Sequence, residues 1–141
     1  MLVDANLLLY AVDRSSARHE AAAAWLTGAL RGPRRVGLPW SSLSAFLRIA
    51  TNPRASRAPL DAAAAWSVVD ALLVHDTVWI PAPTARHAEV FGTLLRRHEA
   101  TGNLVPDVEL AALALQHGLT VCSTDSDFAR FTEIEWANPL A

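Results

Sequence analysis

The chain contains no lysine, a single cysteine and no long apolar run. A helix that crosses a bilayer needs about 20 apolar residues, so we expect a soluble protein without membrane contact. The lone Cys122, within an apolar segment, leaves no partner for an internal disulfide. The chain begins directly with a strand-like segment instead of the basic and apolar regions of a signal peptide, which predicts a cytoplasmic location.

An excess of positive charge is also missing. The net charge is −2, whereas a non-specific nucleic-acid binder usually carries a clear basic excess. All twelve basic residues are arginines, whose forked guanidinium groups suit phosphate, although a GC-rich coding bias explains the same usage equally well. Composition therefore allows a phosphate-containing substrate without requiring one.

No glycine-rich loop follows the first apolar segment, where the sequence is only Asp4-Ala5-Asn6. This argues against a dinucleotide site or a P-loop. At 141 residues, with 52% hydrophobic and 18% charged residues, the chain fits one globular domain spanning residues 1–141.

Short strand-like segments alternate with helical patterns along the whole chain. Strands are expected at 1–3, 36–38, 77–80, 119–122 and 134–136, and helices at 6–12, 16–30, 40–50, 61–74, 84–98 and 106–117. Parallel strands need crossover connections, and helices supply them. The expected fold is a three-layer α/β/α sandwich with a central parallel sheet.

Aspartates stand where strands end. Asp4 ends the first strand, Asp125 and Asp127 follow the strand at 119–122, and Asp107 lies in the first turn of the helix before it. Taken singly, each has a local explanation as a helix cap or a partner of the helix dipole. Open α/β sheets bind ligands at the carboxyl ends of strands, and clustered carboxylates repel unless a cation such as Mg²⁺ or Mn²⁺ lies between them.

The segments 1–10, 38–54, 102–107 and 123–128, in this order and spacing, resemble the PIN domain. More narrowly, they resemble the VapC toxins of type II toxin–antitoxin pairs. The resemblance implies an endoribonuclease that depends on Mg²⁺, or alternatively Mn²⁺, and an antitoxin protein as partner. It places the metal ligands and catalytic acids on Asp4, Asp107 and Asp125, with Asp127 as a fourth candidate.

One position departs from the family pattern. PIN domains usually carry a glutamate in the helix after the second strand, where this chain has Ala45. The number of bound metal ions is therefore open, and Glu109 is the alternative acid in this part of the sequence.

Four polar side chains are expected to assist the acids. Asn6 and Thr124 are candidates for hydrogen bonds to the carboxylates. Arg48 and Arg54 are candidates for binding the flanking phosphates of RNA, or are equally well a solvated helix end and loop.

Two other functions stay open at this point. An aspartate-based phosphatase or phosphate-transfer domain normally has a second acid two residues after the first, where this chain has Asn6. A PIN-like module without catalysis could instead bind RNA or a protein.

The apolar surface also predicts a homodimer. The helices at 16–30 and 61–74 carry more apolar surface than one buried face needs. Large aromatic side chains add to this surface, namely Trp25, Trp40, Trp66 and Trp79.

Overall fold

The computed structural model describes all 141 residues. In chain order the elements are β1 (Leu2–Val3), α1 (Ala5–Val12), α2 (His19–Arg31), β2 (Val36–Gly37), α3 (Trp40–Ala50), α4 (Ala62–Leu73), β3 (Val78–Trp79), α5 (His87–Arg97), α6 (Leu104–His117), β4 (Val121–Cys122), the 3₁₀ helix η1 (Ser126–Arg130) and β5 (Trp136–Ala137). None of the helices has both the length and the apolar character that crossing a membrane requires.

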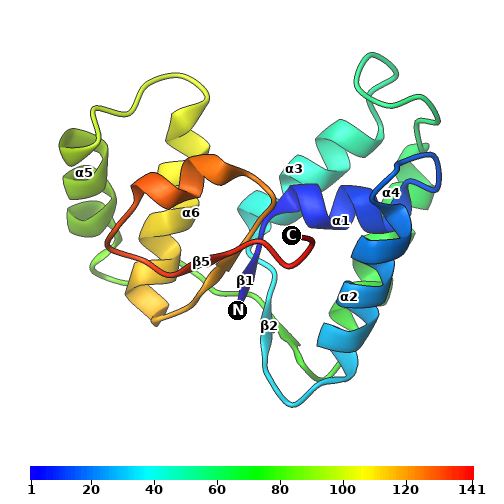
Figure 1. The fold of residues 1–141 in the computed structure, drawn as a ribbon, viewed down its shortest axis with the longest axis horizontal. Helices are drawn as coiled ribbons and strands as arrows, with labels where there is room; N and C mark the ends of the chain where they lie inside the picture. Colours follow the sequence, from blue (N-terminus) through cyan, green and yellow to red (C-terminus); the bar gives the residue numbers. More distant parts are fainter.

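The five strands form one sheet in the order β3-β2-β1-β4-β5, and every neighbouring pair is parallel. Helices α5 and α6 lie on one side of the strands, and α1 to α4 lie on the other (Figure 1). The predicted three-layer α/β/α fold with a parallel sheet is confirmed. The last strand lies at an edge, as expected.

Side-chain alternation along the strands divides the core into two clusters. Leu2 and Val121 lie opposite each other in β1 and β4 and pack against α5, α6 and η1. Val3 and Cys122, one residue later in each strand, pack with residues of α1 to α4. Successive strand residues point to opposite faces, so a strand of two residues suffices to join both clusters.

Several predicted boundaries were wrong by a few residues. The helix expected at 16–30 begins at His19 and has no side-chain cap, because Ser15 and Ser16 make turn hydrogen bonds with Asp13 and Arg18 instead. The strands are shorter than expected, and the last lies at Trp136–Ala137. Helix α3 was predicted with its observed bounds.

Candidate metal centre

The centre lies where the neighbouring strands β1 and β4 end. The backbone N–H of Asp4 donates to the Cys122 carbonyl at 3.0 Å, so the residues that follow the two strands lie side by side. Within the sheet, β1 lies between β2 and β4. The chain leaves β1 toward β2, whereas β4 and β5 extend the sheet in the opposite direction. A change of direction of this kind in an open α/β sheet creates a crevice at the carboxyl ends of the strands.

Asp4 is held from two directions. It is the N-cap of α1, where its Oδ1 accepts from the Ala5 N–H at 2.7 Å, and its Oδ2 accepts from the Ser123 hydroxyl at 2.7 Å. Burial raises the pKa of Asp4; the two hydrogen bonds oppose this rise, and the charge of Asp125 adds to it. Asp4 is therefore a fixed, half-buried carboxylate rather than a freely moving one.

Ser123 joins the residues that follow the two strands. Its side chain is fully buried, and its Oγ accepts from Asn6 Nδ2 at 3.0 Å and from the Asp125 N–H at 3.0 Å while donating to Asp4. Asn6 thus supports Asp4 through Ser123 and not directly. Thr124, predicted for the same role, forms no side-chain hydrogen bond. Ser123 was not predicted, and its only signal was its position between a strand and an aspartate.

Three carboxylates face one another beside this network. One oxygen from each of Asp107, Asp125 and Asp127 lies within 4.8 Å of the other two. Asp107 comes from the first turns of α6, and Asp125 caps η1 by accepting from the Asp127 N–H at 2.9 Å. Asp127 is exposed and the other two are half-buried.

The pKa of Asp107 records this crowding. Burial, followed by the charges of Asp125, Asp4 and Asp127, raises it to about 6, against a smaller opposing effect of Arg130. Asp4 does not belong to the group of three, but its charge reaches both Asp107 and Asp125. The four acids thus form one electrostatic unit.

The donor set fits a hard divalent cation. Oxygens on opposite sides of an ion lie about 4.0–5.2 Å apart, twice the roughly 2.0–2.6 Å bonds of Mg²⁺ and Ca²⁺. The group of three meets this limit, and its ligands are all carboxylate oxygens. The buried Asn6 Oδ1, which has no hydrogen-bond partner, is a further unused oxygen close to Asp4 and Ser123.

The remaining predicted residues lie around this centre or away from it. Glu109 follows Asp107 by two helical positions, which do not share a face, and it is not in the acidic group. Ala45 is half-buried in α3. Arg48 lines a shallow depression with Trp66, and Arg54 is exposed in the loop after α3. RNA binding by the two arginines stays a prediction.

Known proteins show the same sequence pattern. The sequence model of the PIN domain family matches residues 1–134. The chain belongs to the PIN domain family. This PIN domain is 42% identical to ribonuclease VapC37 and 37% identical to ribonuclease VapC33, both of Mycobacterium tuberculosis. Each alignment spans 140 residues, 99% of this chain, and covers 97% and 98% of the two relatives.

Solved structures share the fold of this PIN domain. The VapBC2 structure from Rickettsia felis, bound to a promoter DNA fragment, superposes with a TM-score of 0.71 at 16% identity, over 97% of this chain and 96% of that one. VapC20 of Mycobacterium tuberculosis, a sarcin–ricin-loop-cleaving toxin, superposes with a TM-score of 0.69 at 20% identity, over 95% and 98%. The resemblance to the PIN domain and to VapC ribonucleases, inferred from the sequence, is confirmed.

Proposed function

We propose that this PIN domain is the toxin of a type II toxin–antitoxin pair, acting in the cytoplasm as a metal-dependent endoribonuclease. The observation that carries the proposal is the group of three carboxylates within 4.8 Å, in a chain 42% identical to a VapC ribonuclease over nearly its whole length. The donor set favours Mg²⁺ or Mn²⁺.

In this proposal the acids have separate tasks. Asp107, Asp125 and Asp127 hold the ion, and Asp4, fixed by Ser123, completes the negative site from β1. When bound there, Mg²⁺ would supply Lewis-acid chemistry that polarises the scissile phosphate and lowers the pKa of a water. The chain itself orients the carboxylates. No nucleophilic side chain is needed, because water attacks the phosphorus.

The antitoxin partner rests on a second feature. A groove of about 640 Å³ opens between α1, α3 and the loop 55–60, and its lining is largely apolar, including Leu9, Val12, Phe46, Ile49 and Leu60. Solved neighbours of the same fold include VapBC pairs from Rickettsia felis and nontypeable Haemophilus influenzae. We propose that an apolar segment of an antitoxin occupies this groove.

The homodimer rests on exposed aromatic surface. Trp40 and Trp66 are 48% and 47% exposed, at the start of α3 and within α4. Tryptophan is enriched at protein interfaces, so we propose that these two side chains contact a second copy. Sedimentation of the purified protein tests the dimer.

The experiment that tests the nuclease is expression without a partner. The wild-type protein is expected to arrest growth and to cleave RNA in the presence of Mg²⁺ but not of EDTA, and Asp4→Asn is expected to abolish both effects. Asp61→Asn is the matched control: Asp61 caps α4 through a hydrogen bond of 2.7 Å, as Asp4 caps α1, but it is exposed and far along the chain from the acids.

Equal toxicity of the wild type and Asp4→Asn at matched protein levels would contradict the proposal. Tight RNA binding without Mg²⁺ and without any cleavage would favour the non-catalytic module instead. Sequencing the RNA ends produced after induction would identify the bond that is cut.

A further inference from the structure

Arg130 is the last residue of η1, the 3₁₀ helix that carries Asp127 and is capped by Asp125. A 3₁₀ helix has three residues per turn, so side chains three positions apart lie one above the other. Arg130 follows Asp127 by three positions. The two side chains therefore share one face of η1, beside the acidic group.

Buried aromatic side chains hold this segment in place. Phe128 and Phe131, which flank Ala129 and Arg130, are 0% and 1% exposed, and their rings meet edge to face at 5.9 Å. The Phe131 ring also contacts His98 at 4.9 Å. Rotating η1 as a whole would pull both rings from the core. The packing of its neighbours thus fixes the backbone of Arg130 and the face of η1 from which its side chain extends.

Arg130 is nevertheless unpaired. Both ion pairs of the protein use Glu133, and Arg130 forms no ion pair or side-chain hydrogen bond. Its charge still reaches the centre, because it opposes the rise in the Asp107 pKa, a rise led by burial. An exposed guanidinium beside three carboxylates, but bonded to none of them, keeps its forked donors free for another anion.

We infer that Arg130 binds a phosphate of the RNA strand next to the scissile bond and so positions the strand over the acids. The inference deepens the proposed nuclease function and rests on it. A forked guanidinium makes two parallel hydrogen bonds to a phosphate, which fixes the orientation of the strand as well as its distance.

The test measures binding of a short fluorescein-labelled single-stranded RNA by anisotropy. Ca²⁺ replaces Mg²⁺, and a gel confirms that the RNA stays intact. Arg130→Gln is expected to weaken binding about tenfold, the lower range for a lost charge-assisted contact. It should also reduce the slope of log K against log salt by about 0.7, the value for one phosphate contact on a single strand. Arg130→Lys should recover part of the affinity.

Arg34→Gln is the control variant. It removes the same charge from an exposed residue that precedes β2, at the opposite end of the strands from the acids. RNA binding and the salt slope should stay at the wild-type values in this variant. Equal behaviour of the Arg130 and Arg34 variants, with a wild type that binds and cleaves RNA, would overturn the inference and leave the nuclease proposal standing.

Mn²⁺ titration and the melting temperature distinguish RNA binding by Arg130 from a purely structural role of Arg130 in η1. If Arg130 acts on RNA, Arg130→Gln should bind Mn²⁺ at least as tightly as the wild type, because a repelling charge is gone, and should melt at the same temperature. Parallel losses of RNA binding, Mn²⁺ binding and melting temperature would show that Arg130 only supports η1. A wild type that neither binds nor cleaves RNA would overturn both proposals.

Discussion

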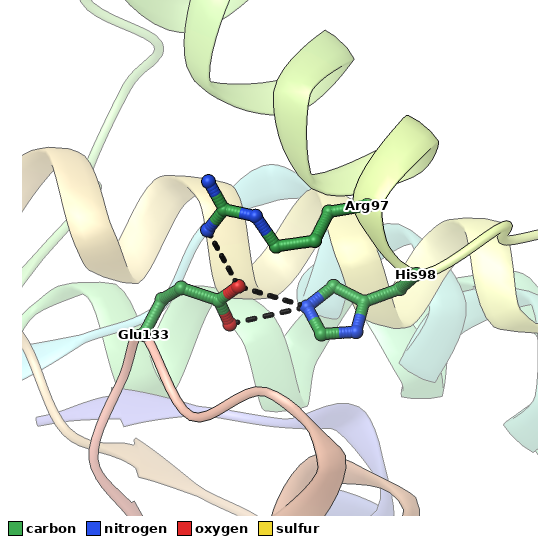
Figure 2. A network of polar contacts seen from close by, with 3 residues as sticks. All are labelled: Arg97, His98 and Glu133. Atoms are coloured by element: carbon green, nitrogen blue, oxygen red, sulfur yellow. Dashed lines mark hydrogen bonds and ion pairs between the residues drawn. The ribbon is translucent and has the colours of Figure 1, made fainter.

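Two groups of charged side chains lie at the two ends of the segment from Ser123 to Glu133, and they are built in opposite ways. At one end, Asp107, Asp125 and Asp127 crowd together without a cationic partner within bonding distance. At the other, Glu133 accepts from Arg97 at 2.8 Å and contacts His98 Nε2 at 3.0 Å (Figure 2). The first group is unbalanced, and the second is paired.

Their pKa values diverge accordingly. Burial and neighbouring negative charges raise the pKa of Asp107 to about 6. Burial acts on Glu133 in the same direction, but hydrogen bonds from Arg97, its own backbone and His98 outweigh it and lower the pKa below 4.5. The two shifts differ because hydrogen bonds to Glu133 oppose the effect of burial, whereas Asp107 accepts no such bond and has negative neighbours. Where partners are missing, the carboxylates remain available for a cation.

The largest expected effect comes from Asp107→Asn, which keeps the side-chain size and removes one charge from the unbalanced group. RNA cleavage should fall on the order of 100-fold or more, because the proposed function makes Asp107 a ligand of the ion. The metal-free protein should become about 1 kcal/mol more stable, since repulsion is relieved at a half-exposed site. Cleavage assays and urea unfolding measure the two effects. A lower free energy of unfolding in the variant would contradict the view that the Asp107 carboxylate lacks stabilising partners.

Glu133→Gln should act in the opposite way on the paired group. The free energy of unfolding should drop by about 1–2 kcal/mol, because the contacts to Arg97 and His98 weaken. The effect stays small because the Arg97 side chain is largely exposed. RNA cleavage per folded molecule should change little. Glu99→Gln, at an exposed residue whose side chain forms no hydrogen bond or ion pair, is the control for loss of a negative charge. A fully active Glu133→Gln protein with an unchanged free energy of unfolding would show that the contacts of Glu133 do not stabilise the fold.

The pH dependence of the free energy of unfolding should distinguish the acidic group around Asp107 from the paired Glu133 without any mutation. The folded-state pKa of Asp107 is raised from 3.8 to about 6, so its stabilising contribution is complete below pH 3.8 and is lost as the pH rises toward 6. In metal-free protein this loss should amount to about 1 kcal/mol after allowance for solvent screening. The contribution of Glu133 is present above its ordinary pKa of 4.5 and is lost in more acid solution.

Unfolding curves between pH 4 and 7, with EDTA or with Mn²⁺, measure this dependence. Saturating Mn²⁺ should remove the decline, because the ion replaces the proton as the partner of the carboxylates. A decline of the same size with and without Mn²⁺ would place its origin outside the acidic group.

The smallest expected effect concerns Ala45, where most PIN domains carry glutamate. Ala45→Glu should tighten Mn²⁺ binding several-fold if the α3 position faces the centre, with little change in melting temperature because the site is half-buried. Isothermal titration and thermal melting measure both quantities. Unchanged Mn²⁺ affinity together with a marked loss of stability would show that position 45 faces the core, where an unpaired carboxylate is costly.

Some elements were predictable because their signals are local. The apolar spacing of Leu43, Phe46, Leu47 and Ala50 defines α3 with its observed bounds. Gly118 ends α6 in the left-handed conformation, with a φ of 64°, as its position after the helical pattern predicted. Strand ends were harder to predict, because pairing with a neighbour decides where a strand of two residues stops.

The sequence by itself determined the alternation of strands and helices and the placement of aspartates at strand ends, since periodicity and turn chemistry act over a few residues. Only the tertiary structure decided that Asp127 joins Asp107 and Asp125 within 4.8 Å. It also decided that the unpredicted Ser123 bridges Asp4 to Asp125. Likewise, only the structure showed that Glu133 is paired while Arg130 is not. The physical reason is that charge interactions and desolvation depend on distances and burial between residues far apart in the chain. Those quantities exist only after β1 and β4 have paired in register and brought the two ends of the chain together.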